Sequence, residues 1–167
     1  MTEQNPYPSQ ENSGYQAGQQ QGQPAGAAPQ GGPGGVYEYD AFGNPLPQGA
    51  KNLAMWAHLS GLLGVVLSAG ILSFLGPLIF WLIYKDRPGY GYVRLAAANA
   101  FNFNFTLWLI NLVAAIFTVL TLGVGFLVTW IVFFAIWIGT IVFHIIAAIK
   151  ANDGEPYKYP FNLSILK

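Results

Sequence analysis

Apolar residues fill two long stretches of the chain that contain no Asp, Glu, Lys or Arg. The first stretch covers 33 residues, 52–84, and the second covers 55 residues, 95–149. A bilayer core about 30 Å thick requires about 20 apolar residues for each helical crossing. Only helices and closed barrels pair all their own backbone groups inside it. The pattern therefore predicts an integral membrane protein built from transmembrane helices.

Length divides the second stretch into two helices. As one helix it would be about 80 Å long at about 1.5 Å per residue, so we expect two crossings joined by a turn. Thr121, Gly123 and Gly125 lie close together in the middle of the stretch and favour a turn there. The first stretch leaves only about 15 residues on each side of a turn at 68–74, which permits either one crossing or a short hairpin.

The basic residues decide between these alternatives. With an even number of crossings all seven would lie on one side of the membrane, whereas a single crossing in the first stretch would separate Lys51 from the rest. They are Lys51, Lys85, Arg87, Arg94, Lys150, Lys158 and Lys167. The sequence therefore favours an all-α membrane protein in the cell membrane, with both termini cytoplasmic. Its four helices form two hairpins, at about residues 52–69, 75–86, 94–119 and 124–151.

Composition changes at the start of the membrane domain. The first 50 residues contain 10 Gly, 9 Gln and 7 Pro, a composition that buries too little apolar surface to offset the entropy of ordering it. We expect residues 1–50 to be a disordered cytoplasmic tail. Residues 51–167 form the membrane domain, with a short interfacial tail at the C-terminus. The chain has no cysteine, which excludes disulfides and cysteine-ligated metal sites.

Amide side chains inside the predicted third helix are candidates for a functional role. On a helical wheel Asn99, Asn102 and Thr106 share one face, while Asn104 and Asn111 lie nearly opposite them. Amides within a membrane commonly hydrogen-bond between helices. This packing role is favoured over a hydrated path, because no charged group accompanies the amides.

His58 and His144 are the other candidates. Each lies six or seven residues inside a flanking lysine, so the predicted topology places both about 10 Å from the same membrane face, where they could meet. A structural hydrogen bond is the favoured role. The alternatives are a proton-responsive pair or half of a metal site, although a metal would require further ligands.

Catalytic motifs are missing from the sequence. It has no G-x-S-x-G nucleophile motif, no H-E-x-x-H motif and no phosphate-binding Gly-rich loop. We therefore expect no enzymatic activity and no cofactor. Nothing indicates a nucleic acid or a small-molecule substrate, so the expected partners are the lipid bilayer and either a second copy of the chain or another membrane protein.

Several short blocks point to a family. Residues 57–64 read Ala-His-Leu-Ser-Gly-Leu-Leu-Gly, Gly76-Pro77 and Asn102-Phe103 follow, and residues 147–154 read Ala-Ala-Ile-Lys-Ala-Asn-Asp-Gly. In this order and spacing, over about residues 50–167, they resemble the DUF4870 family, which is grouped with Tic20-like proteins. The resemblance implies a bacterial four-helix membrane domain.

Together these observations predict a non-enzymatic multi-pass membrane protein that acts by association. It would be an oligomer or an accessory subunit of a membrane complex, because small and amide residues lie on its helix faces. The alternative is a pore or carrier component, by analogy with the protein-import role of Tic20-like proteins.

Overall fold

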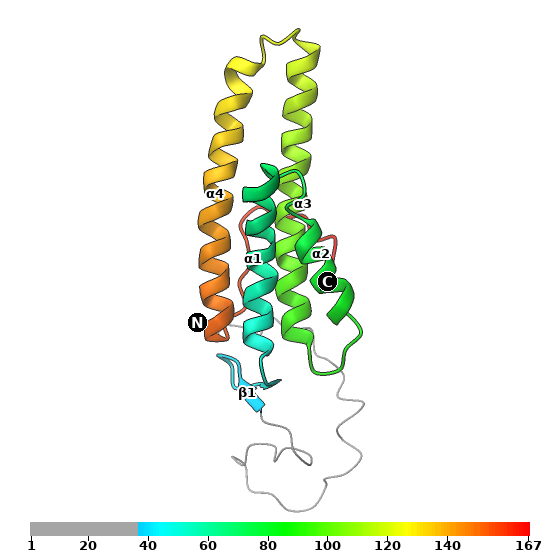
Figure 1. The fold of residues 1–167 in the computed structure, drawn as a ribbon, viewed down its shortest axis with the longest axis vertical. Coiled ribbons are helices and arrows are strands. Elements are labelled where there is room, and N and C mark those ends of the chain that lie inside the picture. The colour runs from blue at the N-terminus through cyan, green and yellow to red at the C-terminus, as the bar shows by residue number, and fades with distance from the viewer. Residues whose placement is uncertain (1–36) are drawn as a thin grey trace, which may run out of the picture.

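The structure, a computed structural model, describes residues 37–167 and is dominated by helices (Figure 1). Its helices are α1 Ala50–Ser68, α2 Leu75–Tyr84, α3 Gly91–Leu120 and α4 Phe126–Asp153. Two three-residue strands, β1 Tyr37–Tyr39 and β2 Pro45–Pro47, form an antiparallel sheet before α1. The predicted all-α class with four helices is confirmed.

Three helices, α1, α3 and α4, are long and apolar enough to cross a membrane. The fourth, α2, has 10 residues and is about 15 Å long, which is shorter than a bilayer crossing. Figure 1 shows that the start of α1, the end of α2, the start of α3 and the end of α4 lie at one end of the molecule. The 30 residues of α3 and the 28 of α4 carry these helices well past the α1–α2 turn.

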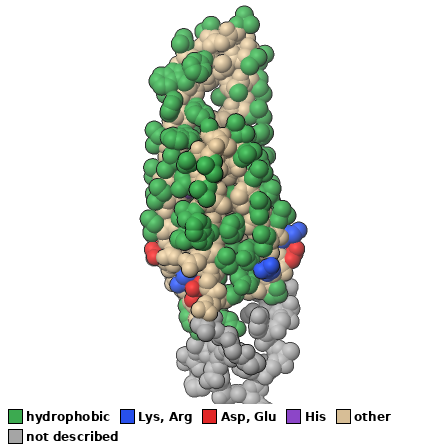
Figure 2. Space-filling view, viewed as in Figure 1, with side chains coloured by type: hydrophobic (Ala, Val, Ile, Leu, Met, Phe, Trp, Pro, Cys, Tyr) green, Lys and Arg blue, Asp and Glu red, His purple; other side chains and the backbone are tan. Residues whose placement is uncertain are grey.

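Charged side chains of the described residues gather at this same end, here called the charged end (Figure 2). Lys150 forms an ion pair with Glu155, with Nζ 2.7 Å from Oε2, and Lys85 lies 3.7 Å from Asp86. On the face shown in Figure 2, the helices beyond it expose many hydrophobic side chains and no charged ones. This separation of charge from apolar surface suits a protein that is anchored in a bilayer at one interface.

Residues 37–47 correct the prediction of a tail that is disordered up to residue 50. Between the strands, Asp40 Oδ1 accepts hydrogen bonds from the backbone N–H groups of Phe42 and Asn44, at 2.9 and 2.8 Å. Leu46 is buried against the helices, and Glu38 Oε1 accepts a bond from the Lys51 N–H at 2.7 Å. Contacts with the helical domain thus stabilise a segment whose composition alone indicates disorder. Residues 1–36 of the predicted tail lie outside the described residues.

Buried alanines allow α1, α3 and α4 to pack closely. Ala54 and Ala57 of α1, Ala97 and Ala100 of α3, and Ala147 of α4 are fully buried. Small side chains at helix interfaces let backbones approach, which is how membrane helices gain packing energy. The three helices therefore form a tight bundle near the charged end, and this bundle contains the buried polar residues described next.

Candidate functional site

His58 and His144 lie in the interior of this bundle, on either side of a tyrosine from the C-terminal segment. Both imidazoles are fully buried, one on α1 and one on α4. The Tyr159 hydroxyl lies 2.9 Å from His58 Nδ1, and the Tyr159 ring centroid lies 5.7 Å from that of His58 and 5.3 Å from that of His144. With Asn104 of α3, these side chains form what we call the polar cluster.

Asn104 links α4 to the α1–α2 turn. Its amide nitrogen, Nδ2, lies 3.0 Å from His144 Nε2 and donates to the Ser73 carbonyl at 3.2 Å. His144 Nδ1 lies 2.9 Å from the Thr140 carbonyl, which can only accept, so His144 must carry its proton on Nδ1. Its Nε2 is then an acceptor for Asn104. The Ser73 carbonyl and His144 Nε2 are thus both acceptors. They fix the orientation of the Asn104 amide, with Nδ2 toward them and Oδ1 pointing away from them.

Gly61 of α1 is what allows this arrangement. A Cβ atom at Gly61 would lie 2.5 Å from both Asn104 Nδ2 and His144 Nε2. Such distances are well inside van der Waals contact, so any larger residue would displace the amide or the imidazole. The glycine lets the hydrogen-bonded pair pack directly against the α1 backbone.

Two polar atoms of the cluster, His58 Nε2 and Asn104 Oδ1, are buried without a hydrogen-bond partner among the described residues. An unpaired buried polar atom costs about 1 to 3 kcal/mol. In the described part of the chain no three His, Asp or Glu side chains lie close enough together to share a metal ion. Because two of its polar atoms have no partner within residues 37–167, the cluster can bind a group that forms hydrogen bonds. None of its four members is a carboxylate.

Tyr159 is the member of the cluster that the sequence analysis missed. Its side chain is buried and stacks on Phe103 with ring centroids 4.3 Å apart. Burial raises the pKa of the Tyr159 phenol well above its ordinary value, and the nearby Tyr157 raises it further. The phenol is thus neutral and able to hydrogen-bond with His58. No periodicity marked Tyr159, because it lies in an irregular segment after α4.

The other amide face of α3 binds the backbone of the C-terminal segment. Asn102 Oδ1 accepts from the N–H groups of Ile165 and Leu166, at 3.1 and 2.8 Å, and Asn102 Nδ2 donates to the Leu166 carbonyl at 2.9 Å. Asn99 Nδ2 donates to the Tyr157 carbonyl at 2.9 Å. The two faces of α3 thus serve different partners: Asn99 and Asn102 hold the C-terminal segment, and Asn104 faces α4.

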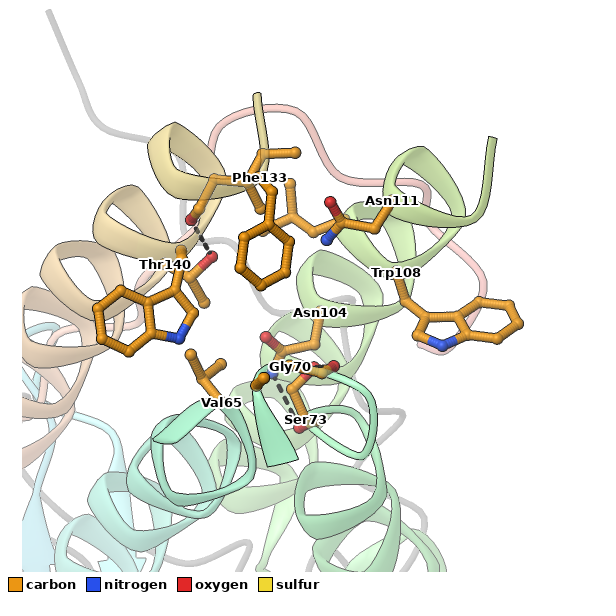
Figure 3. Close-up of a pocket in the computed structure, with 12 residues that line it drawn as sticks. Val65, Gly70, Ser73, Asn104, Trp108, Asn111, Phe133 and Thr140 are labelled. Carbon is orange, nitrogen blue, oxygen red and sulfur yellow. Dashed lines mark hydrogen bonds between the residues drawn. The ribbon is translucent and has the colours of Figure 1, made fainter. Parts of the chain in front are cut away.

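Asn111 lies on the same face as Asn104 but outside the polar cluster. It lines a cavity between α3 and α4, just beyond the α1–α2 turn (Figure 3). Asn104 and Thr140 line the near side of this cavity, and Phe133 faces Asn111 across it. The predicted site residues therefore divide into three groups: the polar cluster, the binding site for the C-terminal segment, and this cavity.

Comparison with known proteins corrects the family resemblance given above. The sequence model of the MamF/MmsF family, described as the magnetosome magnetite crystal formation protein family, matches residues 49–166. The resemblance to DUF4870 and Tic20-like proteins was therefore wrong: short blocks such as His-Leu-Ser-Gly suit the close packing of membrane helices and were not specific to that family. No curated protein and no solved structure gives a significant match.

Proposed function

The chain belongs to the MamF/MmsF family of magnetosome magnetite crystal formation proteins, and from this membership we propose that it contributes to magnetite crystal formation as a component of a membrane. We propose further that it has no enzymatic activity of its own. It acts by association, as an oligomer or as an accessory subunit of a membrane complex.

The distribution of charge supports an orientation in that membrane. The basic residues of α-helix ends and loops lie at the charged end, and Figure 2 shows apolar surface beyond it. Since basic residues concentrate in cytoplasmic loops, the charged end faces the cytoplasm. The α3–α4 turn, which lacks charged residues between Thr121 and Gly125, faces the opposite side.

The α1–α2 turn has features that support its position inside the bilayer, before the membrane surface opposite the charged end is reached. From the charged end α1 reaches about 28 Å, whereas α3 reaches about 45 Å. Irregular backbone is tolerated in hydrocarbon only where its polar groups are paired. Here Ile71 N–H donates to the Ser68 carbonyl at 3.1 Å, Leu72 N–H donates to Ser68 Oγ at 2.8 Å, and Asn104 donates to the Ser73 carbonyl.

The outer face of α4 is the surface that best supports association, and this observation carries the proposal. A Cβ atom at Gly139 would meet nothing closer than the Phe143 side chain at 4.0 Å, and Ala135, one turn earlier, is exposed. Small residues four positions apart on an exposed membrane helix permit close approach of another helix. Asn99, Asn102 and Asn104 are already bonded within the chain, so association rests on this small-residue face and not on the amides.

The carboxylates support an indirect contribution to crystal formation. Residues 37–167 contain five of them. Asp40 caps the β1–β2 turn and Glu38 binds the Lys51 N–H group, while Asp86 and Glu155 lie beside lysines. Four of the five have partners within the chain, so these carboxylates do not form a surface that is open to bind mineral. Their arrangement fits a protein that organises a membrane complex better than one that binds the crystal directly.

The oligomeric state of the full-length protein in mild detergent tests the proposal. Cross-linking and native mass spectrometry should detect an oligomer or a co-purifying membrane protein, and Gly139→Leu should reduce it. Ala115→Leu, a comparable change at an exposed position of α3, should leave it unchanged. A protein that is monomeric and without partners would contradict the association role. In a magnetosome-forming host that lacks the native copy, the same Gly139→Leu variant should fail to restore magnetite crystal formation.

A further inference from the structure

Beyond the polar cluster, a partly open cavity lies between α3 and α4, and the end of α1 and the α1–α2 turn line its near side. At the near end Asn104 of α3 meets His144 of α4, and at the far end Thr118 Oγ1 lies 2.9 Å from Thr129 Oγ1. Asn104, Asn111 and Thr118 are spaced seven residues apart, so they share the face of α3 that is turned toward α4. The cavity lies at Asn111, midway along this face.

One buried acceptor faces this cavity. Asn104 lines it and is 1 % exposed, yet its Oδ1 has no hydrogen-bond partner among the described residues. The orientation of the amide is fixed, as shown above, by two acceptors on the Nδ2 side. Figure 3 shows Oδ1 directed away from Ser73, into the space below Phe133. A group that binds Asn104 Oδ1 must therefore donate a hydrogen bond. The oxygen atoms of ethers, esters and ketones can only accept, so they cannot bind there.

Size and depth restrict the donor further. The cavity volume is about 20 Å³, which holds about one water-sized group. Asn104 lies ten residues beyond Arg94, about 15 Å into the bilayer, where a charged donor would be costly. Apolar residues, among them Leu107, Phe133 and Ile136, line the cavity beside its polar floor. A small neutral donor on an apolar chain fits these features.

We propose that this cavity binds the hydroxyl group of a lipid-phase alcohol. The hydroxyl donates to Asn104 Oδ1, and the hydrocarbon of the same molecule leaves the cavity between α3 and α4 and contacts Trp137. Binding supplies the partner that Asn104 Oδ1 lacks, whereas an internal water would supply it without selecting any lipid. This site is independent of the association role proposed above. The cavity lies on the side of α4 that is turned toward α3, whereas the proposed association surface is the outer face of α4.

Tryptophan fluorescence of the full-length protein in nanodiscs tests the proposal. The probe is a long-chain alcohol with a bromine a few carbons from its hydroxyl group, because bromine quenches tryptophan on contact and must lie near the cavity. The matched probe is its methyl ether, which carries the same bromine but cannot donate. The alcohol should quench saturably, with an apparent affinity about tenfold higher than that of the ether. Equal quenching by the two probes, or quenching without saturation, would overturn the proposal and leave the cavity to water.

Two variants locate the effect. Leu107→Phe adds bulk to the cavity wall, since Leu107 lines it, and should reduce the affinity for the alcohol about tenfold. Leu112→Phe makes the same change at an exposed position of α3 and should leave the affinity unchanged. Equal affinities in the two variants would place the alcohol elsewhere. If Leu107→Phe loses helical content by circular dichroism, the comparison of alcohol with ether in the unmodified protein still decides the question.

Discussion

The Tyr159 hydroxyl lies 2.9 Å from His58 Nδ1, although 101 residues separate the two in the sequence. This bond ties the C-terminal segment to the first helix inside the bundle. Tyr159 also contacts rings of α3 and α4, namely Phe103 and His144. One side chain after the last helix thus contacts all three long helices.

Tyr159→Phe should lower stability by about 1 to 3 kcal/mol, because it keeps the ring but leaves His58 Nδ1 buried and unpaired. The free energy of unfolding can be measured by titrating the purified protein with SDS in mixed micelles. Tyr157→Phe is the matched control, since Tyr157 is only partly buried, and it should change stability little. Equal effects of the two substitutions would show that the His58 bond contributes nothing.

The Tyr159 phenol makes the stability of the protein depend on pH in the alkaline range. Burial raises the pKa of Tyr159 in the folded protein, so its contribution is fully present below the ordinary tyrosine pKa of about 10. It is lost as the pH rises above that value, because the unfolded chain then releases the proton more readily. The stability difference between the unmodified protein and Tyr159→Phe should therefore shrink as the pH rises above about 10. Parallel stability curves over this range would contradict the assignment.

Gly61→Ala should separate Asn104 from His144. A Cβ atom there would lie 2.5 Å from both polar atoms, so either the pair parts or α1 shifts, at a cost of about 1 to 3 kcal/mol. Gly139→Ala is the control, because a Cβ at that position meets no atom closer than 4.0 Å. The control should be neutral or stabilising by up to about 1 kcal/mol, as judged by SDS unfolding. A stable Gly61→Ala protein would show that the pair has room to move.

Asn102→Ala should release the end of the C-terminal segment. It removes three hydrogen bonds to Ile165 and Leu166, each worth about 1 kcal/mol. Hydrogen–deuterium exchange of peptides that cover residues 160–167 should become about tenfold faster or more, while exchange in α1 stays unchanged. Asn111→Ala, on the opposite face of α3, should leave the segment protected. Unchanged exchange in Asn102→Ala would mean that other contacts hold the segment.

Single cysteines test the proposed topology, because the chain has none of its own. In sealed vesicles a membrane-impermeant maleimide should label Lys158→Cys from one side and Leu122→Cys from the other. Ile71→Cys, in the α1–α2 turn, should resist labelling from both sides, although Ile71 is 64 % exposed in the isolated chain. Labelling of Ile71→Cys from the same side as Leu122→Cys would show instead that α1 and α2 cross completely.

The sequence by itself determined the membrane character and the four helices. Hydropathy and charge are local properties, so the uncharged stretches 52–84 and 95–149 identify these elements without any knowledge of packing. The helices nevertheless differ at their ends: α2 stops at Tyr84 and α3 begins at Gly91, earlier than predicted in both cases. The β1–β2 hairpin was missed, because its stability comes from contacts with the helices and not from an alternating pattern.

Only the tertiary structure decided which polar groups meet. The helical wheel placed Asn104 and Asn102 on different faces of one helix, but it could not show that one face binds His144 and the other binds the C-terminal backbone. His58 and His144 could be placed at similar depth from the sequence, while Tyr159 between them could not. Hydropathy gives the depth of a residue in the membrane. Its neighbours across the bundle depend on how helices far apart in the sequence pack, which no local pattern encodes.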